Sequence, residues 1–241
     1  MRTGLASFLM AGLLGSAAFA ASVQVTFTQL PGTAAVATGV YSADLSGLGL
    51  SSIQSITIQD NSAGLGGSPG QFSGFDLDAI ILSNTNYTSA TAAGTASGLP
   101  VFDYSPAGTF FTPGAQRPPT DPKLFGTDAS GTNVNNSVAT LGLFDGNSDT
   151  LAPFGWISLG DNGAITFNLT SAVSTTNLWL YIGEVGNNGE VAAGHISVSD
   201  QPSVPAPLPS SFWGGLMLLT AAGFSQVRSV RTFFARRMAA M

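Results

Sequence analysis

A run of aspartate and asparagine side chains has the clearest chemical spacing in this chain. Asp145, Asn147 and Asp149 stand at alternate positions, a spacing that can place three oxygen ligands around a calcium ion. A complete EF-hand loop also needs glycine at its sixth position and glutamate at its twelfth, where this chain has Thr150 and Trp156. The alternative is an ordinary turn in which Asx side chains bond nearby backbone amides. Calcium is therefore the one cofactor that the sequence suggests, and an EF-hand is excluded.

Two more carboxylates, Asp76 and Asp78, lie two residues apart in a predicted strand, so both side chains project from one face. They could act as a hydrolase pair, in which one carboxyl is held protonated beside an ionised partner, or as a second cation site. The simplest interpretation is that both are solvated acids on the outer face of the strand. Glu184 and Glu190 flank the Gly-Asn-Asn-Gly turn at 186–189 and are interpreted as solvated residues on either side of a hairpin turn.

Nucleophilic catalysis has little support in the sequence. His195 is the single histidine, so any Ser-His-Asp triad has to use it. No Gly-x-Ser-x-Gly motif supplies a nucleophilic serine. The chain has no cysteine, which excludes disulfides, thiolate metal sites and a cysteine nucleophile. We therefore expect His195 to be a structural or surface residue.

Four aromatic residues could form a platform for stacking on a sugar ring, or could equally belong to the core. They are Phe154, Trp156, Trp179 and Tyr181. Trp179 and Tyr181 share strand parity, as a stacking pair would.

Charge is sorted by position along the chain. All thirteen acids lie between Asp44 and Asp200, and the only bases in that part are Arg117 and Lys123, which gives it a net charge of −11. Because nucleic acids are bound through Lys and Arg contacts to phosphate, a nucleic-acid partner is excluded.

The first 20 residues have the three parts of a secretory signal peptide. Arg2 precedes an apolar run at 4–15, and the segment ends in Ala-Phe-Ala at 18–20. We expect export by the Sec machinery and cleavage between Ala20 and Ala21. The alternative, an N-terminal membrane anchor, is disfavoured because the apolar run is short and a strand pattern follows it.

The C-terminal part has three successive segments: a proline-rich stretch at 203–209, an uncharged apolar stretch at 210–227 and a basic tail at 228–241. The apolar stretch is near the lower length limit for a membrane-spanning helix. The positive-inside rule keeps the tail cytoplasmic through its arginines, Arg228, Arg231, Arg236 and Arg237. A buried amphipathic helix is the alternative, but the apolar residues do not keep to one helical stripe.

This tail resembles the PEP-CTERM sorting signal of exported proteins from Gram-negative, biofilm-forming bacteria. The motif residues are Val204, Pro205, Ala206, Pro207, Leu208 and Pro209. Residues 204–207 match the Val-Pro-Glu-Pro core with alanine in place of glutamate, and 206–209 match the Val-Pro-Leu-Pro variant with alanine in place of valine. The resemblance implies an exosortase, an integral membrane transpeptidase-like enzyme, as the sorting partner. The inner membrane is a further implied partner, and exopolysaccharide is a candidate one.

Between the two ends, residues 21–202 are expected to form one all-β domain, a β-sandwich or jelly-roll. Short alternating or β-branched runs, separated by turn residues, predict strands at 22–30, 53–58, 75–82, 138–144, 155–159, 164–169, 177–182 and 191–198. Asp161-Asn162-Gly163 predicts a hairpin. The segments 156–167, 178–184 and 196–199 are similar to the β-sandwich ectodomains of PEP-CTERM proteins.

Residues 83–131 are expected to be a long Pro- and Gly-rich excursion, because prolines at this density cannot serve a central strand. Phe102, Tyr104, Phe110 and Phe111 indicate that the excursion packs on the sheet. Two small β-domains joined here are the alternative, but each would have a thin core.

The sequence thus predicts an exported cell-surface or biofilm-matrix protein with a structural or adhesive role and no catalysis. A secreted carbohydrate- or calcium-binding module is the alternative. A secreted hydrolase that depends on Asp76 is a third class.

Overall fold

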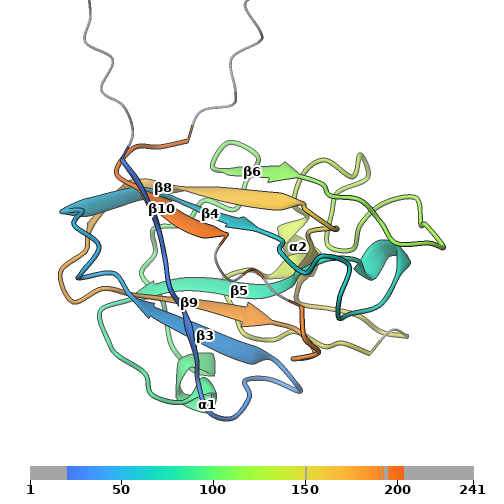
Figure 1. The fold of residues 1–241 in the computed structure, drawn as a ribbon, viewed down its shortest axis with the longest axis horizontal. Coiled ribbons are helices and arrows are strands. Elements are labelled where there is room, and N and C mark those ends of the chain that lie inside the picture. The colour runs from blue at the N-terminus through green and yellow to red at the C-terminus, as the bar shows by residue number, and fades with distance from the viewer. Residues whose placement is uncertain (1–20, 150, 191, 193–194, 204–241) are drawn as a thin grey trace, which may run out of the picture. The chain divides into compact units, whose positions relative to one another are not determined.

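The computed structural model describes residues 21–149, 151–190, 192 and 195–203, which form two antiparallel β-sheets with few helices (Figure 1). This confirms the all-β prediction. The predicted signal peptide at 1–20 and the predicted sorting motif, membrane helix and basic tail at 204–241 lie outside the described residues. Within the described part of the chain, none of the helices has the length and apolar character needed to cross a bilayer.

The first sheet has five strands in the order β1-β10-β4-β8-β6. Their bounds are β1 (Ser22–Gln24), β10 (Ile196–Ser199), β4 (Ser52–Gln59), β8 (Ala164–Ser174) and β6 (Thr109–Thr112). The second sheet has the order β2-β3-β9-β5-β7. Its strands are β2 (Thr28–Gln29), β3 (Gly39–Asp44), β9 (Trp179–Glu184), β5 (Asp76–Ser83) and β7 (Ile157–Ser158).

The two sheets form two layers, with the main core between them (Figure 1). The inward positions of β4 and β8 alternate, as at Ile56, Ile58 and Phe167, all fully buried. On the facing sheet, β5 contributes Ile80 to this core and β9 contributes Leu180. Such period-two burial is what removes the apolar face of each sheet from water.

A second apolar layer covers the outer side of the second sheet. It contains Val40, Ile81 and Tyr181, together with Ala90 and Ala93 of helix α1 (Ala90–Gly94). Ser89 caps this helix by accepting from Ala92 N–H at 3.2 Å. Strand β5 is therefore buried along its whole length, between the main core and this layer.

The excursion at 83–131 is part of the same double-sheet unit. Both sheets combine strands from before and after it, and its own strand β6 pairs with β8 at the edge of the first sheet. Phe102, Tyr104 and Phe111 pack against the main core, as predicted. This strand order contradicts the alternative of two small β-domains, because neither half of the chain forms a sheet of its own.

The described chain begins and ends at one corner of the molecule. Ala21 N–H donates to Asp200 Oδ1 at 3.0 Å, and β1 pairs with β10. Beyond β10, side chains of the first sheet hold the chain at three points. Gln54 Nε2 donates to Asp200 O, Ser55 Oγ donates to Gln201 O, and the Asn168 amide bonds both Ser203 O and Ser203 N–H at 2.8 Å and 2.7 Å.

Two strand predictions are wrong in detail. The run 138–144 is not a strand: it contains the end of helix α2 (Asn136–Ala139) and a turn. The Asn135 side chain caps α2 by accepting from Ser137 N–H, and Asn136 Oδ1 accepts from Leu141 N–H, so asparagine side chains stabilise a helical turn here. The run 22–30 is split into β1 and β2, which belong to different sheets.

The predicted hairpin at 161–163 is a turn of another kind. Asn162 has the expected positive φ of 64°, and Gly163 N–H donates to Gly160 O at 2.9 Å. However, β7 before the turn lies in the second sheet and β8 after it lies in the first. The turn therefore carries the chain between layers instead of pairing two neighbouring strands.

Close backbone contact explains part of the glycine content. Gly74 has φ +77°, and a Cβ on it would overlap the carbonyl of Gly160, whose own Cβ would meet the backbone of Gly114. We expect Gly74→Ala to lower the free energy of unfolding by about 3 kcal/mol, because both the conformation and the space exclude a methyl group. Gly47→Ala is the matched control, since nothing lies within 4 Å of its Cβ position. Urea denaturation of both variants measures this; equal stabilities would contradict the prediction.

Candidate functional site

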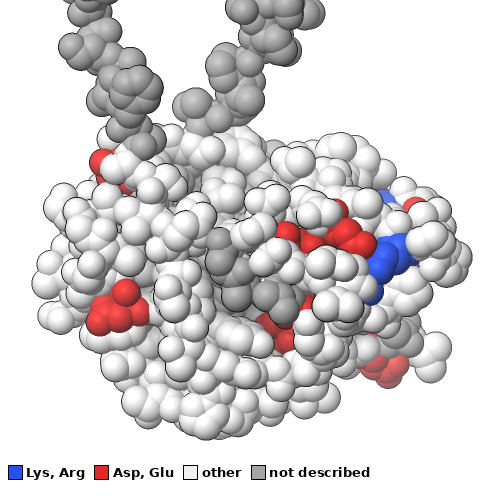
Figure 2. Space-filling model, viewed as in Figure 1, with Lys and Arg blue, Asp and Glu red and all other residues white. Residues whose placement is uncertain are grey.

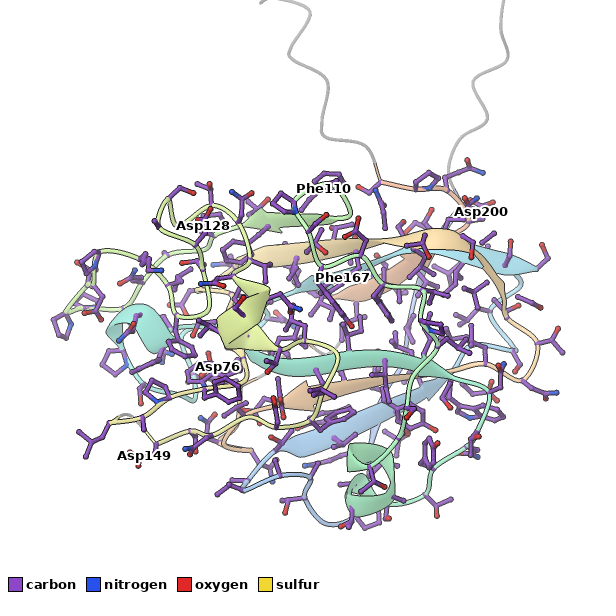
Figure 3. All side chains as sticks on the ribbon, turned by 180° about the vertical axis from the view of Figure 1, so that it is seen from behind. Asp76, Phe110, Asp128, Asp149, Phe167 and Asp200 are labelled. Carbon is purple, nitrogen blue, oxygen red and sulfur yellow. The ribbon has the colours of Figure 1, made fainter. Side chains whose placement is uncertain are left out.

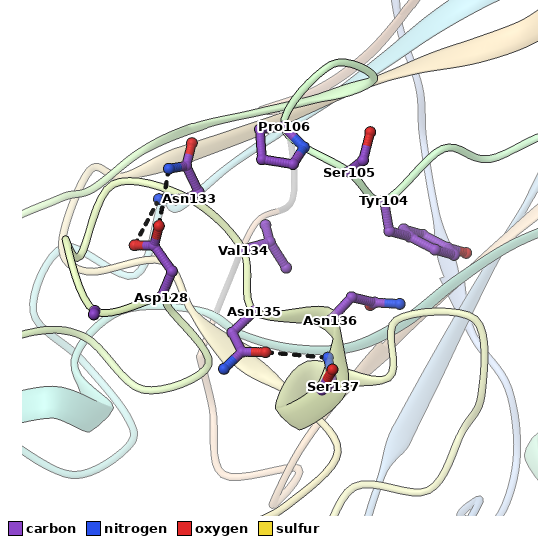
Figure 4. Close-up of a pocket in the computed structure, with 10 residues that line it drawn as sticks. Tyr104, Ser105, Pro106, Asp128, Asn133, Val134, Asn135, Asn136 and Ser137 are labelled. Carbon is purple, nitrogen blue, oxygen red and sulfur yellow. Dashed lines mark hydrogen bonds between the residues drawn. The ribbon is translucent and has the colours of Figure 1, made fainter.

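A polar groove of about 750 Å³ lies on the flank of the two-layer fold, open to solvent (Figure 4). One wall is formed by residues 104–106, which lead into β6. The opposite wall is formed by 128–129 and 133–134, and α2 with its cap at 135–137 closes the third side. The walls thus come from two segments that lie well apart in sequence and are held on one scaffold.

Tyr104, in the first wall, is fixed by contacts with the core beneath the groove. Its hydroxyl oxygen lies 3.3 Å from Ile80 O and 3.4 Å from Leu141 O, so it donates to the backbone of the core. Its ring stacks on Phe102, with centroids 5.7 Å apart and an interplanar angle of 4°. Burial raises the pKa of Tyr104, so the hydroxyl stays protonated. This wall is therefore rigid and neutral.

The second wall is a loop organised by Asp128. Its carboxylate accepts from Ser130 N–H and Oγ, and from Asn133 N–H and Nδ2. These bonds, first the one from Ser130 and then those from Asn133, lower the pKa of Asp128, which is ionised at neutral pH. Lys123 Nζ donates to Thr127 O at 2.5 Å and to Asp128 O at 2.9 Å. The loop is therefore held in shape before any ligand arrives.

The third side presents asparagine amides. Asn135 Oδ1 and Asn136 Oδ1 each accept a backbone N–H, from Ser137 at 3.2 Å and from Leu141 at 3.0 Å. Their Nδ2 groups have no partner in the described structure, and neither does Asn133 Oδ1. Figure 4 shows the Asn136 side chain extending toward Tyr104 across this side of the groove. The asparagines that line the groove therefore have two amide donors and one amide acceptor free of protein partners, each on an amide that is bonded through its other atom.

A second unusual cluster, the acidic cluster, is buried at the end of the sheets where β5 begins and β9 ends. It consists of Asp76, Glu184 and Glu190, which are 4 %, 0 % and 3 % exposed. Asp76 N–H donates to Glu190 Oε2 at 2.9 Å. Asp76 Oδ1, both oxygens of Glu184 and Glu190 Oε1 are buried without a hydrogen-bond partner among the described residues. Three carboxylates in this state cannot all be ionised without a large desolvation penalty.

Burial raises the pKa values of all three carboxyls of this cluster, and mutual repulsion raises those of Asp76 and Glu190 further. Desolvation raises the pKa of Glu184 to about 8, although the backbone N–H groups of Asn188 and Asn187 face it and lower the pKa somewhat. Desolvation and the charge of Glu184 raise the pKa of Glu190 to about 9. Desolvation, then the charge of Glu190, places the pKa of Asp76 well above its ordinary value.

A glycine-rich loop, residues 64–68, covers Glu190 of the acidic cluster. A Cβ on Gly67 would overlap Glu190 Oε1, so the loop backbone lies directly on this carboxyl. Arg117 holds the loop by donating to three of its carbonyls, Gly64 O at 3.3 Å, Gly66 O at 2.6 Å and Ser68 O at 3.2 Å. Its Nε also lies 3.5 Å from Asp161 Oδ1. Figure 2 shows the basic side chains of this face gathered at one end, next to acidic ones.

The acidic cluster lies between two small pockets. Asp76 lines one of about 250 Å³ together with Trp156 and Asn188. Glu190 lines another of about 190 Å³, which is mostly apolar and includes Tyr41. Desolvation, then the charge of Glu184, raises the pKa of Tyr41. The cluster thus borders two cavities while its own unpartnered oxygens remain out of contact with solvent.

The interpretation of Asp76 and Asp78 as solvated acids is wrong, because both are buried. Asp78 accepts from Thr38 Oγ1 at 2.6 Å and from the N–H groups of Asp145 and Gly146 at 3.2 Å and 3.0 Å. Desolvation still raises its pKa to about 7. The pairing of β5 with β9 shifts register between Leu77 and Ile80, which places the two carboxyls in different surroundings. They do not form a pair across a cleft.

The interpretation of Glu184 and Glu190 as solvated residues beside a hairpin turn is also wrong, because both are buried. The register Leu77↔Glu184 places Glu184 at an inward position at the end of β9, and the loop at 64–68 covers Glu190. The turn between them has positive φ at Gly186, Asn187 and Gly189.

The predicted calcium ligands at 145–149 have their side chains in local hydrogen bonds. Asp145 Oδ1 accepts from Thr140 Oγ1, Asn147 Oδ1 accepts from Asp149 N–H, and Asp149 Oδ1 accepts from Leu151 N–H. The bonds at Asn147 and Asp149, each from the backbone N–H two residues on, are those of the Asx-turn alternative. In the part of the chain that the structure covers, no group of three Asp, Glu, His or Cys side chains is arranged to hold a metal ion. Calcium binding stays a prediction.

The aromatic residues do not form one platform. Trp156 is buried and contacts Phe125 and Phe72, with ring centroids 4.5 Å and 5.3 Å apart. Tyr181 is buried on the outer side of the second sheet, where its hydroxyl donates to Thr85 O. Phe154 is 44 % exposed. The core interpretation therefore holds for Trp156 and Tyr181.

His195 is exposed and immediately precedes β10, where its carbonyl accepts from Gln59 N–H at 3.1 Å. No described contact joins its ring to a serine or a carboxylate. Of the predicted processing residues, Ala21 opens the described chain, whereas Ala20, Val204–Pro209 and the four tail arginines lie outside the described residues.

Sequence reasoning missed the groove and the acidic cluster. The signals that could have indicated them are the asparagines at 133, 135 and 136, and the single arginine in a region with a glycine-rich turn at 64–70. Comparison with known proteins adds no further residue, because no family model, no curated protein and no solved structure matches this chain.

Proposed function

We propose that this chain is an exported, tail-anchored protein of the cell surface or biofilm matrix, which acts by adhesion and not by catalysis. The observation that carries the proposal is the separation of the polar groove from the chain ends. Figure 3 places Asp128, beside the groove, and Asp200, beside the chain ends, on opposite sides of the molecule. A fold attached through the corner at Ala21 and Ser203 would leave the groove free for a partner.

The chemistry of the groove supports a binding role. Its polar groups are amides, hydroxyls and one carboxylate with a lowered pKa, which is unsuited to hold a proton for acid catalysis. The carboxyls with raised pKa values, Glu184 and Glu190, are both buried, and the loop at 64–68 lies directly on Glu190. The same proposal includes a sandwich or jelly-roll ectodomain, an exosortase as sorting partner and an inner-membrane stage of sorting. The tail motif at 204–209 supports the sorting part of the proposal.

The proposal is tested by following the full chain in a Gram-negative host with and without its sorting enzyme. We expect a mature N-terminus at Ala21, accessibility to external protease, and loss of surface retention in a chain that ends at Ser203. Pro205→Ala/Pro207→Ala/Pro209→Ala is the matched variant, which keeps the apolar segment and the arginines but removes the motif. Mass spectrometry of both termini gives the readout, and intact chain in the cytosol would contradict the proposal.

A carbohydrate-binding module is the second candidate, and a specific observation favours it. Asn133, Asn135 and Asn136 line a solvent-open groove, and one atom of each side-chain amide has no partner among the described residues while the other atom bonds the protein. Polar groups held ready in this way are typical of sites that orient a ligand.

A further inference from the structure

We propose that the polar groove binds a neutral oligosaccharide. This inference rests on the proposed adhesive function and names the ligand class of the same site. It is carried by the fixed asparagine amides, by the apolar surface between them, by the dimensions of the groove and by its charge.

The amides match the hydrogen-bonding character of sugar hydroxyls. A hydroxyl donates one hydrogen bond and accepts others, so it needs donors and acceptors side by side. Asn133, Asn135 and Asn136 line the groove, and each has one amide atom without a partner among the described residues: the donors Asn135 Nδ2 and Asn136 Nδ2 and the acceptor Asn133 Oδ1. In each amide the other atom already bonds the protein, so the orientation is set before binding and little side-chain freedom is lost.

Apolar side chains also line the groove. Tyr104 and Pro106 lie on one side, and Val134, which is 8 % exposed and belongs to the main core, lies on the other. Ligand sites commonly combine such apolar walls with a few convergent polar groups. Sugar rings present C–H faces as well as hydroxyls, so this combination suits them better than it suits a small ion.

The size of the groove favours a chain over a single ring. Its volume of about 750 Å³ lies in the upper part of the range for small-ligand sites, and it is open to solvent. An internal stretch of an oligosaccharide can therefore lie in it without any recognition of a chain end.

The charges near the groove select a neutral ligand. Asp128 is ionised, and the cation beside it, Lys123, is occupied by the carbonyls of Thr127 and Asp128. Arg117, the other described basic residue, is bound to the loop at 64–68. An acidic glycan would meet a carboxylate with no free cation in the described structure to compensate.

The test uses the full chain in a detergent without a sugar headgroup, titrated by calorimetry with unlabelled hexasaccharides of glucose, galactose, mannose and N-acetylglucosamine. Hexagalacturonate serves as the acidic probe, and an uncharged Gly-Ser-Asn peptide of similar length serves as the protein-like probe. We expect binding of at least one neutral hexasaccharide and none of hexagalacturonate. Failure of the whole neutral panel, or tighter binding of the peptide, would overturn the proposal.

The matched variant is Asn135→Asp/Asn136→Asp. It keeps the oxygens that accept from Ser137 N–H and Leu141 N–H, so α2 keeps its cap, but it removes both free donors. Because the ligand is neutral, the added charge exerts no net Coulomb repulsion on it. We expect the affinity to fall about tenfold, which corresponds to about 1.4 kcal/mol. Asn177→Asp, in an exposed turn outside the groove, is the control and should bind normally.

The outcomes separate this inference from the proposed function. Neutral glycan binding that is unchanged in the double variant would show that the groove is not the binding site. It would still be compatible with an adhesive surface protein. Surface location is read in the sorting experiment, which does not depend on the groove. Thermal melting of each variant confirms that a loss of binding is not a loss of folding.

Discussion

The protein is expected to lose thermal stability as the pH rises from 5 to 9, and Glu184→Gln should remove about 10 °C of that loss. Burial raises the pKa of Glu184 to about 8 in the folded chain, whereas the unfolded chain releases this proton near its ordinary pKa. The stability that the folded state gains by holding the proton is complete below the unfolded pKa and is lost as the pH rises through the folded one.

The magnitude follows from the difference between the folded and the unfolded pKa of Glu184. Each pKa unit of this difference is equivalent to about 1.4 kcal/mol of stability, and we expect about 3 kcal/mol to be observed. In a domain of this size that corresponds to about 10 °C in Tm. Asp78, with a pKa of about 7, and Glu190, with a pKa of about 9, steepen the same decline.

The measurement is a series of thermal melts between pH 5 and pH 9 for the unaltered protein, Glu184→Gln and Asp44→Asn. Asp44 is exposed, and hydrogen bonds from Ser46 lower its pKa, so its replacement should leave the slope unchanged. If the unaltered protein melts at the same temperature across this range, the acidic cluster is ionised in the folded state and the assignment of its protons is wrong.

Replacement of Arg117 by alanine is expected to lower the free energy of unfolding by about 3 kcal/mol. The guanidinium donates to three carbonyls of the loop at 64–68 and faces Asp161, and a hydrogen bond from a charged donor contributes about 1.5–3 kcal/mol before partial compensation by water. Its charge also lowers the pKa values of Asp76 and Glu190, so its removal makes the acidic cluster harder to ionise.

Arg117→Lys is the matched variant, because it keeps the charge but cannot reach three carbonyls in the geometry of a guanidinium. We expect it to recover less than half of the loss. Hydrogen exchange at Gly67, whose N–H donates to Asn188 Oδ1, reports on the loop separately from global unfolding. Unchanged melting together with unchanged protection at Gly67 in Arg117→Ala would show that the loop does not depend on this side chain.

The sequence predicted the strands that have a regular pattern and missed those that do not. β4 and β5 follow the predicted runs 53–58 and 75–82 closely, because alternation or continuous apolar character is visible locally. β3 was not predicted, since Gly-Val-Tyr-Ser-Ala-Asp alternates only weakly. The assignment of 138–144 as a strand failed because capping by Asn135 and Asn136 overrides the local apolar pattern.

The candidate sites were harder to predict, for a physical reason. Acidic side chains are seldom buried, so exposure is the natural expectation for Asp76, Asp78 and Glu184. Their burial depends on contacts between segments far apart in the sequence: Asp78 is held by Thr38 and the backbone at 145–146, and Glu184 pairs with Leu77 across two strands. The groove likewise joins residues 104–106 to 128–137, and no local pattern indicates that contact.

The side-chain hydrogen bonds to the backbone at 200–203 have a mechanical consequence when force is applied to the C-terminal side of the chain. Tension on Ser203 reaches its two hydrogen bonds with the Asn168 side chain on β8 first, then the bonds from Ser55 and Gln54 on β4, and only afterwards the ladder between β10 and its neighbours. These four bonds therefore stand between the applied force and β10. Detachment of β10 under force should begin only after they have broken.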